Sequence, residues 1–435
     1  MPTGLPPPLE PDGAPRLAQL DILRGIAILG ILFMNMDAMG AAMNGLFLGD
    51  PRRLGWTGFD QAIWWGRQLL AEGTARCLLE MLFGAGMVIL TDRAAAHLSE
   101  GRVLREYAWR NGVLLLFGLA HVFILLWPGD ILHTYALAAL LCMGLRRLRP
   151  RLLLTIGLGL ATLHLVGGTL DTAVVTQERA AVAAARTHPA ATATEREAIA
   201  ADDREQATRA RDRRDALARI AAEDRARTGT ARNWVTALWD GFLSLEGLGV
   251  EPLFVLEAAS TMLVGAALFK WGVLQGARSR RFYLGLTVIG YAMGLALRAW
   301  AAWALTRFDD APSYAPAFRE WARLLVTLGH LGLVTLLLRH PTTARALRPF
   351  AAAGRTALTI YVWQTLICQW VIYPPWGLAL YGRQGWAGLM ATALMIDAVL
   401  LALAVWWTRR FAIAPVEWAW RSIVAGWRLA WRKGG

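Results

Sequence analysis

The 435-residue chain is 56% hydrophobic and contains 21 Trp, which is too apolar and too rich in Trp for an ordinary soluble domain. Its formal net charge of +13 would also suit a nucleic-acid-binding protein. The basic residues, however, cluster between apolar runs, as they do in the cytoplasmic loops of membrane proteins. We therefore expect a membrane protein that contacts membrane lipids and has no nucleic-acid partner.

The N-terminal part combines a polar tail with a charged apolar run. Residues 1–15 are rich in Pro and are expected to form a disordered cytoplasmic tail. Residues 20–35 read LDILRGIAILGILFMN and contain Asp21, Arg24 and Asn35. A charge inside a spanning helix costs about 2.5–3.5 kcal/mol on insertion scales, so such a residue usually has a charged partner or a function. Asp21 and Arg24 are three residues apart and share a helix face, where each partly neutralises the other.

Ten apolar runs are long enough to cross about 30 Å of hydrocarbon. They cover residues 18–38, 61–91, 108–127, 131–148, 152–171, 252–275, 282–305, 320–338, 356–374 and 386–408. Every second connecting loop is rich in Arg, so the positive-inside rule places both termini in the cytoplasm. The sequence thus predicts an all-α fold, a polytopic transmembrane helix bundle of about ten spans. Residues 16–175 carry the first five spans and residues 233–410 the last five.

Two segments differ from this pattern. Residues 176–232 are polar, rich in Ala and dense in mixed charge, which predicts a helical extracytoplasmic insertion that runs helical from about Thr194. Either a solvated spacer or a cap that binds a substrate or partner fits this composition. Residues 411–435 alternate Trp with Arg, which indicates an amphipathic interfacial helix on the cytoplasmic side, bound to lipid headgroups.

Three polar residues meet near the predicted outer face. His121 lies close to the end of the third run, and Asp130 and His133 follow across a short turn, with Tyr135 next along the fourth run. A histidine oriented by a carboxylate is suited to act as a general base or an acyl carrier. A polar pair that only fixes the helical hairpin is the other interpretation. Two His and one Asp without a spacing motif do not indicate zinc, and we predict no metal site.

Further charges lie inside the second run. Glu72, Arg76 and Glu80 are each four residues apart, so a continuous helix would place them on one face. Such a ladder either lines a cavity or forms structural ion pairs in the bundle. Glu257, at the outer start of the sixth run, adds a carboxylate near the face that contains His121.

The ninth run opens with Arg355 and contains Tyr361 and Gln364 deeper along it. The predicted topology starts both the first and the ninth span in the cytoplasm, so Arg24 and Arg355 lie at a similar depth. If the two guanidinium groups meet, they form an anion site suited to phosphate or pyrophosphate. Alternatively, Arg355 only caps a helix end at the headgroups.

Several stretches together resemble the YeiB family of bacterial inner-membrane proteins. They are LDILRGIAILGILFMN, Leu82-Phe83-Gly84-Ala85-Gly86, Gly129-Asp130-Ile131-Leu132, Gly354-Arg355-Thr356-Ala357-Leu358-Thr359, Gln364-Thr365-Leu366 and Pro415-Val416-Glu417-Trp418. The resemblance implies a multi-pass protein of the bacterial inner membrane. By this resemblance, family motif positions are occupied by Asp21, Arg24, His121, Asp130, Tyr135, Arg355 and Gln364, whereas His133 and Glu80 lie outside them.

The YeiB family is in turn distantly similar to transmembrane acyltransferases, such as the acyltransferase-3 O-acetylases and the lysosomal heparan N-acetyltransferase. Those enzymes take an acyl group from cytoplasmic acyl-CoA and deliver it to a glycan across the membrane. The resemblance therefore implies acyl-CoA as donor substrate and a glycan or lipid as acceptor.

Two functional hypotheses follow. In an acyltransferase, Arg24 and Arg355, with Asp21 and Gln364, would bind the donor, while the catalytic group would be His121 with Asp130 and His133. In a transporter or flippase of a small amphipathic or lipid-linked molecule, the same residues would line a path. Under either hypothesis, the polar core of the bundle would also include Asn35, Arg76, Glu80, Tyr135, Glu257 and Tyr361. The acceptor and the oligomeric state stay open.

Overall fold

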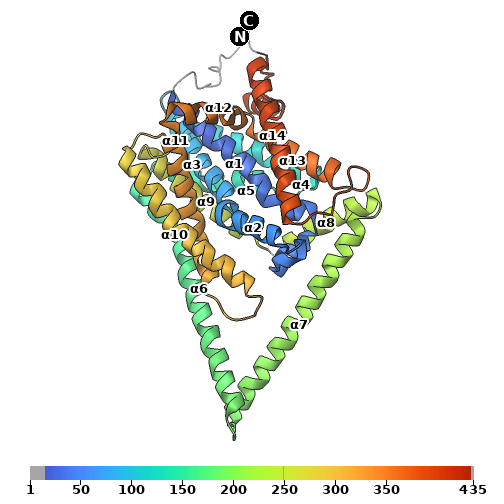
Figure 1. Ribbon diagram of the computed structural model, residues 1–435. Coiled ribbons are helices and arrows are strands. Elements are labelled where there is room, and N and C mark those ends of the chain that lie inside the picture. Colours follow the sequence, from blue (N-terminus) through green and yellow to red (C-terminus); the bar gives the residue numbers. More distant parts are fainter. Residues whose placement is uncertain (1–14, 248, 433–435) are drawn as a thin grey trace.

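The computed structural model describes residues 15–247 and 249–432, and it is built from helices (Figure 1). The α-helices are α1 (Pro15–Gly40), α2 (Gly58–Gly66), α3 (Thr74–Ala95), α4 (Glu100–Phe123), α5 (Leu132–Cys142), α6 (Pro150–Thr187), α7 (Ala193–Arg227), α8 (Ala231–Gly247), α9 (Glu251–Lys270), α10 (Arg280–Thr306), α11 (Arg319–Leu338), α12 (Pro341–Arg355), α13 (Ala357–Ile367), α14 (Trp386–Arg410) and α15 (Pro415–Ala425). Short 3-10 and π turns connect them: η1 (Met43–Leu48), η2 (Pro51–Leu54), η3 (Arg67–Ala71), η4 (Met143–Leu145), η5 (Ala315–Phe318) and η6 (Cys368–Ile372). The described residues contain no strand, and the predicted all-α fold is confirmed.

Within the described part, seven helical segments are long and apolar enough to cross a membrane. They are Ala18–Gly40, Gly58–Ala95, Pro150–Thr187, Glu251–Lys270, Arg280–Thr306, Ala315–Leu338 and Trp386–Arg410. The other three predicted runs fall on α4 and on the shorter apolar segments Leu132–Leu145 and Ala357–Ile372. The chain is therefore a helical membrane protein. The count of ten spans and the cytoplasmic position of the termini stay predictions.

The charged insertion forms a long helical hairpin that projects from the bundle (Figure 1). Its first arm is the continuation of α6 to Thr187, and its second arm is α7. A capping box starts α7, because the Thr192 hydroxyl accepts from the Glu195 N–H while the Glu195 carboxylate accepts from the Thr192 N–H. In Figure 1 the tip of the hairpin lies at the opposite end of the molecule from α12 and the start of α1.

Glycines let the central helices meet backbone to backbone. A Cβ added to Gly84 on α3 would lie 1.8 Å from the carbonyl oxygen of Met262 on α9. A Cβ added to Gly265 on α9 would lie 2.0 Å from the carbonyl oxygen of Met81 on α3. Close approach through small residues is typical of helix packing in membranes, and here it brings the charged faces of α3 and α9 together.

A second glycine contact joins the first and last thirds of the chain. A Cβ on Gly25 of α1 would lie 1.9 Å from the carbonyl oxygen of Phe350 on α12. A Cβ on Gly354 of α12 would lie 1.9 Å from the carbonyl oxygen of Asp21 on α1. The motifs around Arg24 and Arg355 are therefore neighbours in space, because their adjacent glycines allow α1 and α12 to touch.

We predict that Gly84→Ala destabilises the protein by about 1–3 kcal/mol, since the new methyl group would force α3 and α9 apart. Gly86→Ala is the matched control on the same helix, because a Cβ there meets no atom within 4 Å. Ala is favoured over Gly inside a helix by about 1 kcal/mol, so the control should be neutral or slightly stabilising. Unfolding in mixed detergent micelles would measure both variants, and equal stabilities would contradict the close contact.

Candidate functional site

His121 connects a hydroxyl group to a carboxylate in the interior of the bundle. Its Nδ1 lies 2.8 Å from Asp130 Oδ1, and its Nε2 lies 3.0 Å from the Thr365 hydroxyl oxygen. The side chain of His121 is 1% exposed, and Asp130 and Thr365 are fully buried. A hydroxyl, an imidazole and a carboxylate in series form the arrangement that activates a Ser or Thr nucleophile.

A second histidine shares the same carboxylate. His133 Nδ1 lies 2.8 Å from Asp130 Oδ2, and the His133 backbone N–H donates to that oxygen over 2.9 Å. The other ring nitrogen, Nε2, lies 3.1 Å from Glu251 Oε1 at the start of α9. Burial alone would raise the pKa of Asp130, but the hydrogen bonds from His121 and His133 outweigh burial and lower this pKa to about 2. An ionised Asp130 therefore orients both rings.

The helix that carries Thr365 also presents an aromatic ring to His121. The rings of Tyr361 and His121 have centroids 4.8 Å apart. The Tyr361 hydroxyl accepts a hydrogen bond from the Ile131 N–H over 3.1 Å, next to Asp130 in the turn. Tyr361 and Thr365 are four residues apart on α13, so one face of this helix supplies both contacts.

Helix α13 is capped by a carboxylate at its N-terminus and continues into a π turn at its C-terminus. At its N-terminus, the Glu417 carboxylate of α15 accepts from the N–H groups of Leu358, over 2.7 Å, and Thr359, over 3.1 Å. A carboxylate suits a helix N-terminus because it pairs with free N–H groups and with the positive end of the dipole. At its C-terminus, α13 continues into the π turn η6, a feature that is frequent at functional sites.

Arginines gather around Asp21 at the opposite end of α1 from the hairpin base. Arg24 Nη1 lies 2.9 Å from Asp21 Oδ1. Arg355 and Arg421 are within electrostatic range of Asp21, and Arg110 is within range of Arg24 and Arg421. Asp21 is therefore within range of three guanidinium groups, and Arg110 is within range of two of these three. The cluster has an excess of positive charge that suits a phosphate or pyrophosphate.

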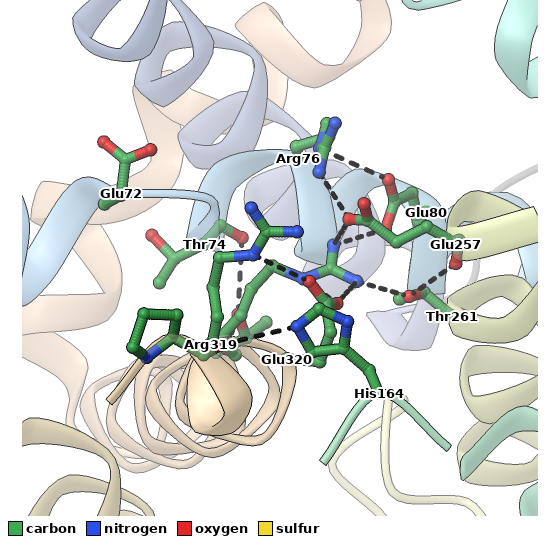
Figure 2. Close-up of polar contacts among 12 residues, drawn as sticks. Glu72, Thr74, Arg76, Glu80, His164, Glu257, Thr261, Arg319 and Glu320 are labelled. Carbon is green, nitrogen blue, oxygen red and sulfur yellow. Dashed lines mark hydrogen bonds and ion pairs between the residues drawn. The ribbon is translucent and has the colours of Figure 1, made fainter. Parts of the chain in front are cut away.

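A buried ion network joins α3, α9 and α11 (Figure 2). Arg323 Nη1 lies 2.9 Å from both Glu80 Oε2 and Glu257 Oε1, and its Nη2 lies 2.9 Å from Glu320 Oε2. Arg76 contacts the same carboxylates, by a hydrogen bond to Glu257 and at 3.6 Å from Glu80. All three carboxylates thus have guanidinium partners, as buried charges require.

Glu72 does not belong to this network, and the predicted three-residue ladder is wrong at that position. Gly73 has a left-handed φ of 68° and lies between the π turn η3, which ends at Ala71, and α3, which begins only at Thr74. Glu72 instead forms an ion pair of 2.7 Å with Arg67. In Figure 2 its side chain lies apart from Arg76 and the two carboxylates that Arg76 contacts.

The other sequence-predicted polar residues have separate places. The Tyr135 hydroxyl donates to the carbonyl of Arg76 over 3.1 Å. Gln364 donates to the Ile28 carbonyl, one turn beyond Arg24 on α1, and to Asp397 Oδ1 over 2.9 Å, so it contacts α1 and α14 rather than the arginine cluster. Asn35 is half-buried on α1.

Comparison with known proteins finds one matching family model and two similar bacterial proteins that align over nearly their whole length. Residues 268–426 match the family model described as protein of unknown function, DUF418. The chain is 28% identical to the uncharacterized protein YeiB of Escherichia coli K12, covering 94% of this chain and 96% of that protein. It is 29% identical to the uncharacterized protein YxaH of Bacillus subtilis 168, covering 94% of each chain. The resemblance to the YeiB family is confirmed. No solved structure matches the chain.

Sequence reasoning missed several residues that this YeiB-like fold brings to the sites. Thr365 was part of a recognised motif, and its spacing from Tyr361 was the available signal for a shared face. Arg110 and Arg323 lie in predicted spans and Arg421 lies in the predicted interfacial segment, and the sequence showed their charge but not their partners. The partner of Asp397 could not be predicted either, because Asp397 and its partner Gln364 lie on two different helices.

Proposed function

We propose that this protein is an acyltransferase of the bacterial inner membrane that moves an acyl group from cytoplasmic acyl-CoA to an extracytoplasmic glycan or lipid. The observation that carries the proposal is the series Thr365, His121 and Asp130, in which a hydroxyl lies 3.0 Å from an imidazole nitrogen. Support also comes from the arginines around Asp21, whose excess positive charge matches the phosphates of CoA.

The first chemical step transfers the acyl group to the protein. The Thr365 oxygen attacks the thioester carbonyl carbon while His121 Nε2 accepts the hydroxyl proton. The carbon–sulfur bond then breaks, and the departing CoA thiolate takes that proton from His121. Asp130 remains ionised and holds the imidazolium in place.

The second step reverses these roles. A hydroxyl group of the acceptor loses its proton to His121 Nε2 and attacks the carbonyl carbon of the Thr365 ester. The ester bond to Thr365 breaks, and His121 returns the proton to the Thr365 oxygen. Because both residues are buried, the substrates reach them only when α13 shifts. The irregular ends of α13, at Thr356 and at η6, are where such a shift would occur.

Replacement of Arg355 by Ala tests donor binding. We expect the affinity for acetyl-CoA, measured by calorimetry on the detergent-solubilised protein, to fall about 10–100-fold, since a charge-assisted hydrogen bond contributes about 1.5–3 kcal/mol. Arg345→Ala is the matched control, because Arg345 is an exposed arginine of helix α12, as Arg355 is, but lies ten residues away from it. If both substitutions weaken binding equally, or if neither weakens it, the donor site does not lie in the arginine cluster.

A transporter or flippase is the second candidate, and the buried ion network favours it. Charged residues inside a membrane bundle commonly mark substrate or ion pathways. Reconstituted vesicles separate the two candidates. An acyltransferase modifies a supplied acceptor and releases free CoA, whereas a transporter moves a lipid-linked molecule between leaflets without releasing CoA.

A further inference from the structure

An open pocket of about 270 Å³ lies where the base of the hairpin meets the loops beside α1 and α14. Arg53 from η2 and Arg383 from the loop before α14 line it, together with Asp224 of α7 and Gln384. The pocket is remote from the arginine cluster around Asp21. Arg24 and the end of α1 at Gly40 are separated by 16 helical residues, or about 24 Å at a rise of about 1.5 Å per residue.

The two arginines of this pocket differ from their neighbours in having no charged partner. Among the described residues, the side chains of Arg53 and Arg383 form no ion pair. The adjacent Arg52 instead pairs with Asp50 at 2.7 Å. The guanidinium of Arg53 is held against the backbone of Gly45, where an added Cβ would lie 2.0 Å from Arg53 Cζ. A positioned guanidinium without a partner is suited to bind a carboxylate or a phosphate.

The hairpin fixes the opposite wall of the pocket. The Tyr381 hydroxyl donates to Asp224 Oδ1 over 2.8 Å, and the ring of Tyr381 lies 4.2 Å from the guanidinium carbon of Arg227. Arg227 is 1% exposed and donates to the carbonyls of Met39, over 2.7 Å, and Ala41, over 3.1 Å, at the end of α1. These contacts hold Asp224 in place before any ligand arrives, which lowers the cost of binding.

We propose that this pocket binds a phosphate group that carries a small hydroxylated moiety, such as the glycerol phosphate of a lipid headgroup or a free glycerol phosphate. The arginines bind the phosphate, and the Asp224 carboxylate accepts hydrogen bonds from hydroxyl groups. The Gln384 amide accepts from Tyr373 and donates to Thr392, and its second N–H and second lone pair are available to a ligand hydroxyl. The volume of about 270 Å³ lies just below the range of about 300–1,000 Å³ that is common for small-molecule pockets, which suits a small moiety. This site does not depend on the proposed acyl transfer, and it assigns a binding role to the base of the charged insertion.

Binding of sn-glycerol 1-phosphate to the full chain in detergent, measured by calorimetry, tests the free ligand. Native mass spectrometry of the protein released from nanodiscs of phosphatidylglycerol or of phosphatidylcholine tests the headgroup. We expect Arg53→Gln and Arg383→Gln each to weaken binding about tenfold. Asp224→Asn should strengthen it, because the substitution removes a negative charge and keeps the oxygen that accepts from Tyr381.

Arg52→Gln is the matched control, since Arg52 is adjacent, exposed and paired with Asp50. If only phosphatidylglycerol is retained, the ligand is a lipid headgroup. If only sn-glycerol 1-phosphate binds, the ligand is a soluble molecule. Either result supports the site. The proposal is overturned if neither probe binds, or if Arg52→Gln weakens binding as much as Arg53→Gln and Arg383→Gln do.

Discussion

Replacing His121 by Ala should lower acyl transfer by about 10²–10⁴-fold, while the protein still folds and binds acyl-CoA. This range is what a positioned proton acceptor contributes to catalysis. Asp130→Asn should cause a smaller loss, because the amide still contacts the ring but no longer supplies a negative charge to stabilise the imidazolium. Transfer would be measured as acylated product per folded molecule, together with acetyl-CoA affinity, so that chemistry and binding are separated.

Thr365 distinguishes a covalent route from direct attack by the acceptor. Thr365→Ser keeps the hydroxyl group and should remain active, whereas Thr365→Val keeps the shape and should be inactive. With acetyl-CoA and no acceptor, an acetyl group should accumulate on Thr365 and be visible by peptide mass spectrometry. If Thr365→Val is active, the acceptor hydroxyl takes the position of Thr365 at His121 Nε2, and the covalent step is wrong.

His164→Ala is the matched control for His121. His164 is exposed on α6, and its ring nitrogen lies 3.3 Å from a backbone carbonyl oxygen, so we expect no loss of transfer. If His121→Ala destabilises the protein while transfer per folded molecule is unchanged, His121 is a packing residue. That result would leave the donor site around Asp21 unaffected, because the two sites are tested by different measurements.

Much of the helical fold could be predicted because hydropathy is a local signal, and each apolar run lies on helical segments. The backbone contact at Gly84 became evident only in the structure. The ladder of charges failed for an equally local reason that only the backbone revealed. Gly73 adopts a positive φ, which interrupts the helix between Glu72 and Arg76. Helical spacing across a glycine is therefore an unreliable guide to a shared face.

The candidate sites were only partly predictable because their partners come from distant segments. His121 and Asp130 are nine residues apart and joined by a turn, so their contact was readable from the sequence. Thr365 is 244 residues from His121, and no periodic pattern relates them. The pocket near Arg53 is formed by loops and the hairpin base, for which hydrophobic periodicity gives no information.

Replacing Arg323 by Met should destabilise the protein by about 3–5 kcal/mol, the typical cost of removing one partner from a buried ion pair. Arg323 is 4% exposed and contacts Glu80, Glu257 and Glu320. Without it, the described ion-pair partners of these carboxylates are the half-buried Arg76 for Glu80 and Glu257 and the exposed Arg319 for Glu320. The loss would appear as a lower midpoint of unfolding in mixed micelles. Adding Glu80→Gln to Arg323→Met should recover part of the stability, because it removes one of the unpaired charges.

Arg319→Met is the matched control on the same helix, with the same change of charge and side chain. The Arg319 side chain is 69% exposed and forms an ion pair of 3.4 Å with Glu320, so its loss should cost less than about 1 kcal/mol. A structural network predicts that Arg323→Met lowers stability but not acyl transfer per folded molecule. If stability is unchanged and activity is lost, the carboxylates are free to exchange partners during turnover, and the network belongs to the functional path rather than to the scaffold.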